Sequence, residues 1–167
     1  MRKLVLLALF ISLLAGCGFK LRGVMNLPYE SIYVNGGGNP AVQAALENAI
    51  LSGTKAQLAP SPDKAQVVVN ILSASYDKII LSLGGTGRVR EYQLIYRLAF
   101  SATYLGKPSI PPQQIELRRD MTYDDTQALA KEQEEALLNK SMQDDAIQQL
   151  LRRLKGAAAT QPAQATP

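Results

Sequence analysis

One stretch of the chain, RVREYQLIYRLAFSATY at positions 88–104, alternates apolar and polar side chains almost without interruption. The apolar parity holds Tyr92, Leu94, Tyr96, Leu98, Phe100, Ala102 and Tyr104. The other parity is mostly polar, with Ile95 and Ala99 as exceptions. Because successive side chains of a strand point to opposite faces, the pattern predicts a long strand with one buried face. The other face should be wet or covered by a partner.

Turns on both sides of this stretch predict further strands. Residues 84–87, GGTG, and residues 105–108, LGKP, are typical turn sequences. Before them, residues 66–83 carry apolar side chains at Val67, Val69, Ile71, Ile79, Leu81 and Leu83, all on one parity. The polar segment 73–77 between the two groups indicates a bulge or a passage beyond the core. After residue 108, Ile115, Leu117, Met121 and Tyr123 predict another strand. Two hairpins in sequence form an antiparallel meander.

Two helices are expected. Asn39 can accept hydrogen bonds from free amides and Pro40 suits a first helical position, so one helix should begin there and end near Gly53. Residues 32–34 predict a strand before it, and residues 56–59 or 66–72 a strand after it. The second helix should run from just after Asp125 to Lys155, with apolar residues at Leu138, Met142, Ala146, Ile147, Leu150, Leu151 and Leu154.

These elements predict an α+β fold, a small mixed and mostly antiparallel sheet of about four strands with two helices packed on one face. Residues 17–155 should form this single domain. Residues 156–167, GAAATQPAQATP, contain no large apolar side chain and predict a disordered tail.

The N-terminal segment has the pattern of a secretory signal. Arg2 and Lys3 precede an apolar run, and residues 14–17, LAGC, resemble the bacterial lipoprotein box. That resemblance implies removal of residues 1–16 and attachment of diacylglycerol and an N-acyl chain to Cys17. Several buried acyl chains hold a protein at a membrane almost irreversibly. Because Gly18 rather than aspartate follows the cysteine, the resemblance implies the outer membrane, with the domain facing the periplasm.

Composition argues against catalysis. The chain has no histidine and one cysteine, so it lacks the usual zinc and copper ligands and the commonest general base. No Gly-x-Ser-x-Gly elbow, phosphate-binding loop or dinucleotide motif occurs. Without Arg2 and Lys3, 16 basic residues remain of 18, against 14 acidic ones, so the mature net charge is +2. We therefore expect no enzyme, no metal, no cofactor beyond the acyl chains and no nucleic-acid partner.

Three short motifs, in order, resemble the LptE family of lipopolysaccharide-assembly lipoproteins: CGFKLR at 17–22, EYQ at 91–93 and ALAK at 128–131. The resemblance implies a mixed sheet backed by two helices. It also implies a plug in the lumen of the outer-membrane β-barrel LptD, where the pair inserts lipopolysaccharide into the outer leaflet and the lipoprotein assists barrel assembly. A plug must be polar enough outside to meet a polar barrel interior.

Basic side chains can contact lipopolysaccharide phosphates through charge-assisted hydrogen bonds. Lys131 matches a lysine that the family uses in this way. The family's second basic position falls near Gly84, so that match fails, and Arg88 and Arg90 just past the turn are the candidates to replace it. The alternative interpretation of Lys131 is that it does not bind lipopolysaccharide and is a solvated lysine among neighbouring glutamates. The alternative interpretation of the two arginines is a charged turn that keeps the hairpin soluble. Arg90 also has the parity of the apolar face.

Two other classes of function fit the residues. A structural or accessory envelope lipoprotein of another barrel machine would share the anchor and the fold but would not bind lipopolysaccharide. A periplasmic hydrolase could use carboxylates such as Asp124 and Asp125, although adjacent residues point in different directions in a helix or a strand.

Overall fold

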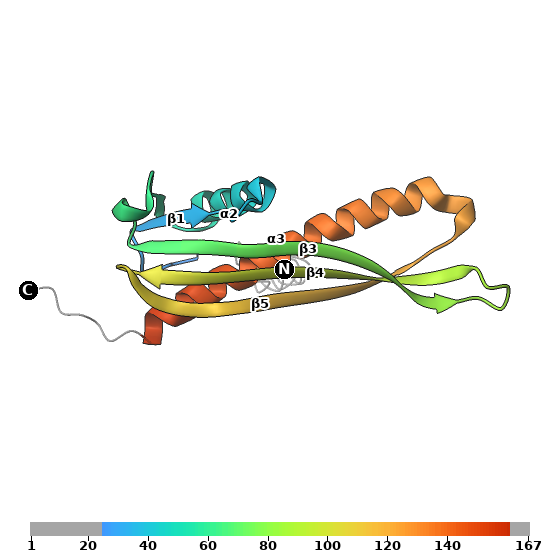
Figure 1. Ribbon diagram of the computed structural model, residues 1–167. Helices are drawn as coiled ribbons and strands as arrows, with labels where there is room; N and C mark the ends of the chain where they lie inside the picture. The colour runs from blue at the N-terminus through green and yellow to red at the C-terminus, as the bar shows by residue number, and fades with distance from the viewer. Residues whose placement is uncertain (1–24, 161–167) are drawn as a thin grey trace, which may run out of the picture.

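The computed structural model describes residues 25–160, which form one five-stranded sheet and two helices (Figure 1). The strands are β1 (Ser31–Asn35), β2 (Gln57–Leu58), β3 (Val67–Leu83), β4 (Val89–Tyr104) and β5 (Lys107–Thr122). The helices are α2 (Pro40–Gly53) and α3 (Ala128–Thr160), with short 3-10 turns η1 (Pro62–Lys64) and η2 (Asp125–Gln127). The predicted α+β class is confirmed. The sheet has five strands rather than four because both alternatives for the strand after α2 are present.

The sheet order is β2-β1-β3-β4-β5. The short strand β1 pairs in parallel with β2 and β3, whereas β3, β4 and β5 form the predicted antiparallel meander. In β4 the predicted apolar parity faces the core, where Leu94, Leu98 and Phe100 are fully buried. Ile95, on the opposite face, is also buried, at 5% exposure.

A bulge in β3 changes which of its side chains face the core. The register with β4 shifts between Ile71 and Ser73, at the start of the predicted polar segment. Before the shift, Val69 and Ile71 face the core, but after it Tyr76 pairs with Tyr96 and takes the core side. Ile79 therefore does not continue the buried row of Val67. Leu81 and Leu83 lie at two further register shifts between Ile80 and Leu83. The three side chains are 46%, 45% and 57% exposed.

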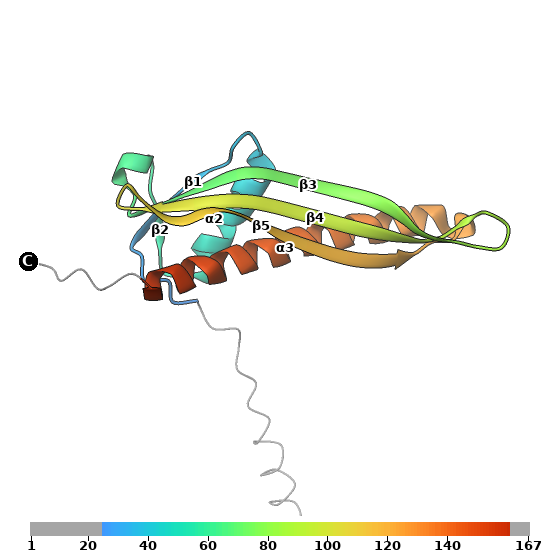
Figure 2. The same cartoon turned by 60° about the horizontal axis from the view of Figure 1, so that its bottom comes forward.

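Both helices cover the same face of the sheet, as predicted (Figure 2). Asn39 caps α2 by accepting a hydrogen bond from the Val42 amide, and Pro40 begins the helix. Its C-cap is Thr54 rather than Gly53, since the Thr54 amide donates to the Ile50 carbonyl. Of the predicted apolar row of α3, Leu138 is only partly buried and packs against the core. The other six residues are buried as predicted: Met142, Ala146, Ile147, Leu150, Leu151 and Leu154.

The helix α3 runs to Thr160, five residues beyond the predicted end at Lys155. Residues 156–160 are thus helical rather than part of a disordered tail. The alanines at 157–159 favour helix by their intrinsic propensity, and Ala157 and Ala158 pack against the core. The remainder of the predicted tail, residues 161–167, lies outside the described residues, as do the signal segment 1–16 and Cys17.

The molecule is elongated, and its two ends differ in packing (Figure 1). The core lies where α2, the second half of α3 and the sheet meet. At the other end the β3–β4 hairpin and the start of α3 project beyond α2. We call residues 79–92 and 122–135 the distal end. No residue of α3 before Met142 is buried, so polar contacts must hold much of the distal end together.

Candidate basic site at the distal end

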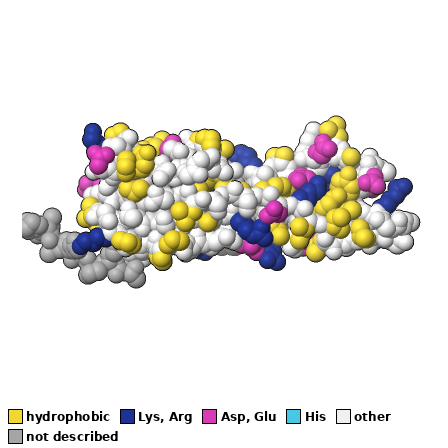
Figure 3. All heavy atoms as spheres, viewed as in Figure 1, with side chains coloured by type: hydrophobic (Ala, Val, Ile, Leu, Met, Phe, Trp, Pro, Cys, Tyr) yellow, Lys and Arg dark blue, Asp and Glu magenta, His cyan; other side chains and the backbone are white. Residues whose placement is uncertain are grey.

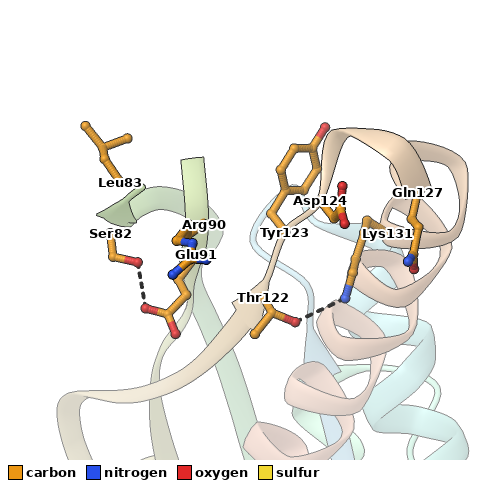
Figure 4. Close-up of a pocket in the computed structure, with 9 residues that line it drawn as sticks. All are labelled: Ser82, Leu83, Arg90, Glu91, Thr122, Tyr123, Asp124, Gln127 and Lys131. Carbon is orange, nitrogen blue, oxygen red and sulfur yellow. Dashed lines mark hydrogen bonds between the residues drawn. The ribbon is translucent and has the colours of Figure 1, made fainter. Parts of the chain in front are cut away.

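The three basic residues predicted from sequence come together at the distal end. An open cleft of about 670 Å³ is lined by Ser82, Leu83, Arg90, Glu91, Thr122, Tyr123, Asp124, Gln127 and Lys131 (Figure 4). A neighbouring hollow at the hairpin turn is lined by Arg88 and again by Arg90. Four segments meet here: the ends of β3 and β5, the beginning of β4, and η2 with the first turn of α3.

Lys131 is less exposed than a surface lysine of a helix would be. Its side chain is only 15% exposed, and Nζ donates to Thr122 Oγ1 at 3.2 Å and to Glu134 Oε2 at 2.8 Å. Figure 4 shows the ammonium group between the end of β5 and the helix. Lys131 is thus less exposed than the solvated lysine of the alternative interpretation, although its ion-pair partner Glu134 is one of the neighbouring glutamates on which that interpretation rested.

The two arginines differ in position, since Arg90 lines the cleft and Arg88 lies on the exposed turn. Arg90 has the same parity as Tyr92, so its side chain lies on the helix side of the sheet, where it lines the cleft that also contains Lys131. In the sequence, Arg90 was the weaker candidate because it shares the parity of the apolar face. That same parity places its side chain on the helix side of the sheet, beside the cleft. Arg88 is 76% exposed and makes a long ion pair of 3.9 Å with Asp125, which matches the description of a charged turn. Ion pairs this exposed contribute little to stability.

A polar cluster beside the cleft joins α3 to the sheet, and sequence reasoning missed it. The carboxylate of Glu135 accepts hydrogen bonds from Tyr76 Oη at 2.9 Å and from Lys78 Nζ at 2.6 Å. The Lys78 ammonium also lies 4.2 Å from the centroid of the Tyr92 ring, within the range of a cation–π contact. We call Tyr76, Lys78 and Glu135 the clasp, because they connect β3 to the helix that carries Lys131.

Opposing effects set the protonation of the clasp. Burial raises the pKa of the Glu135 carboxyl, but the hydrogen bonds from Lys78 and Tyr76 outweigh it, and the net pKa is lowered. Burial and the hydrogen bond to Glu135 raise the pKa of the Tyr76 hydroxyl. At neutral pH Glu135 is therefore a carboxylate and Tyr76 a neutral phenol. The signal that could have revealed it was the bulge, which turns Tyr76 and Lys78 toward the helix.

The two adjacent aspartates have structural contacts. Asp124 Oδ1 accepts from the amide and hydroxyl of Thr126, at 2.9 and 2.7 Å, and so caps η2. These hydrogen bonds lower the pKa of the Asp124 carboxyl. Asp125 faces Arg88. The two carboxylates thus face different partners, which does not resemble a paired acid–base site.

The tyrosines of β4 are packing residues. Tyr96 is 4% exposed, Tyr104 lies 5.7 Å from Tyr29 ring to ring, and Tyr92 meets Tyr123 edge to face at 5.2 Å. This is the arrangement of core and cross-strand aromatic pairs rather than of a row that stacks on sugars. Among residues 25–160, no helix is both long and apolar enough to cross a membrane.

Solved structures to which this chain is similar include two bacterial lipoproteins. An uncharacterized lipoprotein B from Nitrosomonas europaea superposes with a TM-score of 0.76 and is 36% identical, over 86% of this chain and 94% of that chain. The rare lipoprotein B from Shewanella oneidensis has a TM-score of 0.65 and 30% identity, over 78% and 97% of the two chains. The fold thus defines a class of small α+β lipoproteins of bacteria.

Sequence comparison identifies the family within that class. Residues 29–154 match the model of the family LptE, described as lipopolysaccharide-assembly. An LPS-assembly lipoprotein LptE from Yersinia enterocolitica is 29% identical over 90% of this chain and 74% of the relative. The chain belongs to the LptE family, so it is a lipopolysaccharide-assembly lipoprotein, and its role is not enzymatic.

Proposed function

We propose that this protein is anchored in the outer membrane by acyl chains on Cys17 and sits as a plug in the lumen of an LptD-type β-barrel. There it assists assembly of the barrel and insertion of lipopolysaccharide into the outer leaflet. Membership of the LptE family supports this assignment. The single structural observation that carries it is the basic cleft, in which Lys131 and Arg90 line one opening at the distal end.

The lining of the cleft holds two basic groups, Lys131 and Arg90, and two carboxylates, Glu91 and Asp124, which accept hydrogen bonds from Ser82 and Thr126. Lys131 and Arg90 offer N–H donors of fixed charge from two different elements, with Arg88 on the adjacent turn. Phosphates and acidic sugars of lipopolysaccharide accept such charge-assisted hydrogen bonds. Lys131 is already held by Thr122 and Glu134, so little side-chain freedom remains to be lost when a ligand binds.

Binding is tested with purified lipopolysaccharide and charge-reversal variants. We expect Arg90→Glu combined with Lys131→Glu to weaken binding about tenfold or more at low salt, and Arg88→Glu alone to have a smaller effect. Lys107→Glu with Lys155→Glu is the matched control, since both lysines are exposed and removed from the cleft, and the change in net charge is equal. Equal weakening by the control would mean that only overall charge matters.

Pairing with the barrel is tested by affinity purification of the tagged, lipidated protein from outer membranes under gentle detergent conditions, followed by mass spectrometry. A stoichiometric large β-barrel protein is the expected result. The lipoprotein alone, without a barrel, would instead favour the accessory envelope lipoprotein.

A further inference from the structure

The two halves of α3 meet the sheet in different ways. Side chains on one face of a helix recur every three or four residues. In the second half this row is apolar and buried: Met142, Ala146, Leu150 and Leu154. Followed toward the start of the helix, the same row reaches Leu138, Glu135 and Lys131. The face of α3 that lies on the sheet therefore changes from apolar to charged along the helix.

We call residues 128–141 the strap, and no residue in it is buried. Its charged side chains reach the sheet, since Lys131 donates to Thr122 at the end of β5 and Glu135 accepts from the clasp residues of β3. Leu138 is only partly buried. Acidic and basic side chains lie among apolar ones where this half of α3 meets the sheet (Figure 3). The strap is thus attached mainly by polar contacts.

Such contacts hold the strap less firmly than apolar packing holds residues 142–154. The side chains of Lys131 and Glu135 are only 15% and 21% exposed, so closing the strap takes two charges partly out of water. Their attraction to partners offsets this cost but leaves little net gain. A helix as short as the strap is also marginally stable in water without packing. Segments of this kind open locally at a lower free energy than the core.

The strap is connected to the fold at both of its ends. The turn η2 joins it to β5, and Met142, which follows it, is buried in the core. A rigid helix fixed at both ends cannot swing away from the sheet. The strap would therefore open by unwinding, and its backbone amides would lose their hydrogen bonds.

Opening of the strap would take the basic cleft apart. Lys131 belongs to the strap, whereas Arg90 belongs to β4, and the two reach the cleft from different sides (Figure 4). Unwinding would remove Lys131 and leave Arg90 in place. The two charges therefore line one cleft only while the strap is closed.

We propose that the strap opens and closes on the sheet while the core stays folded, and that a phosphate-bearing ligand bridging Arg90 and Lys131 keeps it closed. A ligand that binds only the closed state shifts the equilibrium toward that state. The opening itself does not depend on the proposed function. The effect of the ligand rests on it and adds a conformational consequence to binding.

The opening is measured by amide hydrogen exchange on the purified, full-length lipidated protein in detergent, well below its melting temperature. We expect the amides of residues 132–141 to exchange faster than those of residues 146–154. Glu135→Gln should accelerate exchange in residues 132–141 about tenfold, because a hydrogen bond to a charged group is lost from the closed state.

Ile147→Val is the matched control. It removes one buried methyl group from the second half of the same helix and lowers the stability of the core by a comparable amount. We expect it to accelerate exchange in residues 146–154 and to leave residues 132–141 unchanged. If it accelerates both segments alike, α3 opens as one unit with the core and the proposal is wrong.

The ligand effect is measured with lipopolysaccharide in detergent micelles and with the same lipid after its phosphates have been removed. At about 100 times the dissociation constant, the phosphorylated lipid should slow exchange in residues 132–141 about a hundredfold. The dephosphorylated lipid should have no such effect. Equal slowing by both lipids would overturn the assignment of the effect to phosphate.

The outcomes separate this inference from the proposed function. If lipopolysaccharide binds without slowing exchange in the strap, the coupling is wrong and the proposed function stands. If the wild-type protein binds no lipopolysaccharide, the lipopolysaccharide role fails and the coupling fails with it, whereas the ligand-free exchange still decides whether the strap opens.

Discussion

Removing the charge of Glu135 is the most informative single change at the distal end. The substitution Glu135→Gln keeps the shape and an amide oxygen that can still accept from Tyr76, but it removes the partner of the Lys78 ammonium. The Glu135 and Lys78 side chains are 21% and 30% exposed, so their pairing is more shielded than a surface ion pair. The ammonium would remain shielded without a counter-charge.

The loss of folding stability expected for Glu135→Gln follows from these contacts. Hydrogen bonds to charged groups contribute about 1.5 to 3 kcal/mol each when buried, and exposed ion pairs about 0.2 to 1 kcal/mol. For a partly exposed pair with one hydrogen bond retained, we expect a loss of about 1.5 kcal/mol. In a domain of this size that loss lowers the melting temperature by about 3 to 6 °C. Urea unfolding and calorimetry at pH 7 measure both quantities, and Glu132→Gln, at an exposed glutamate three positions earlier in α3, is the control.

The pH dependence supplies an independent check. The folded-state pKa of Glu135 lies below the ordinary value of 4.5, so its stabilisation is present above that value and is lost as the pH falls through the folded pKa. The difference in stability between wild type and Glu135→Gln should therefore shrink as the pH falls below 4.5 and vanish once the pH lies below the lowered pKa of Glu135. Equal stability of the two proteins at pH 7, or a difference that persists in acid, would refute the role given to the clasp.

Three further changes test the packing. Phe100→Ala should cost about 4 kcal/mol in urea unfolding, because Phe100 is fully buried on β4. Gly37→Ala should reduce stability by more than about 2 kcal/mol in the same assay, since Gly37 has φ +56° and an added Cβ would lie 1.9 Å from the Ile71 carbonyl oxygen. Asn39→Ala should cost about 1 kcal/mol through loss of the hydrogen bond from the Val42 amide, and a stability unchanged by this substitution would contradict the capping role.

Local patterns were enough to predict much of this protein. Period-two alternation placed β4 and its buried face, because a strand that is buried on one side must alternate. The spacing of apolar residues identified the buried row of α3 from Met142 to Leu154. The cap at Asn39 could be predicted because it depends on residues only three apart. The family resemblance rested on short motifs in order, and the match to the family model over residues 29–154 confirmed the family.

Register and long-range contacts could not be determined in this way. The polar segment indicated a bulge in β3, but only the pairing with β4 shows that the shift lies at residue 72 and turns Ile79 away from the core face. A shift of one residue exchanges every side chain that follows between the two faces. That exchange leaves Ile79 exposed and brings Lys78 to Glu135, a residue 57 positions away.

The sequence by itself determined the elements, the fold class, the family and the basic residues Lys131, Arg88 and Arg90 as candidates, since each of these depends on neighbours along the chain. Only the tertiary structure decided that Lys131 and Arg90 share a cleft while Arg88 stays on the exposed turn. It also decided that β1 pairs only with residues 67–70 of β3. The physical reason is that strand pairing and helix docking join residues far apart in sequence, and their geometry is set by the whole fold rather than by any local pattern.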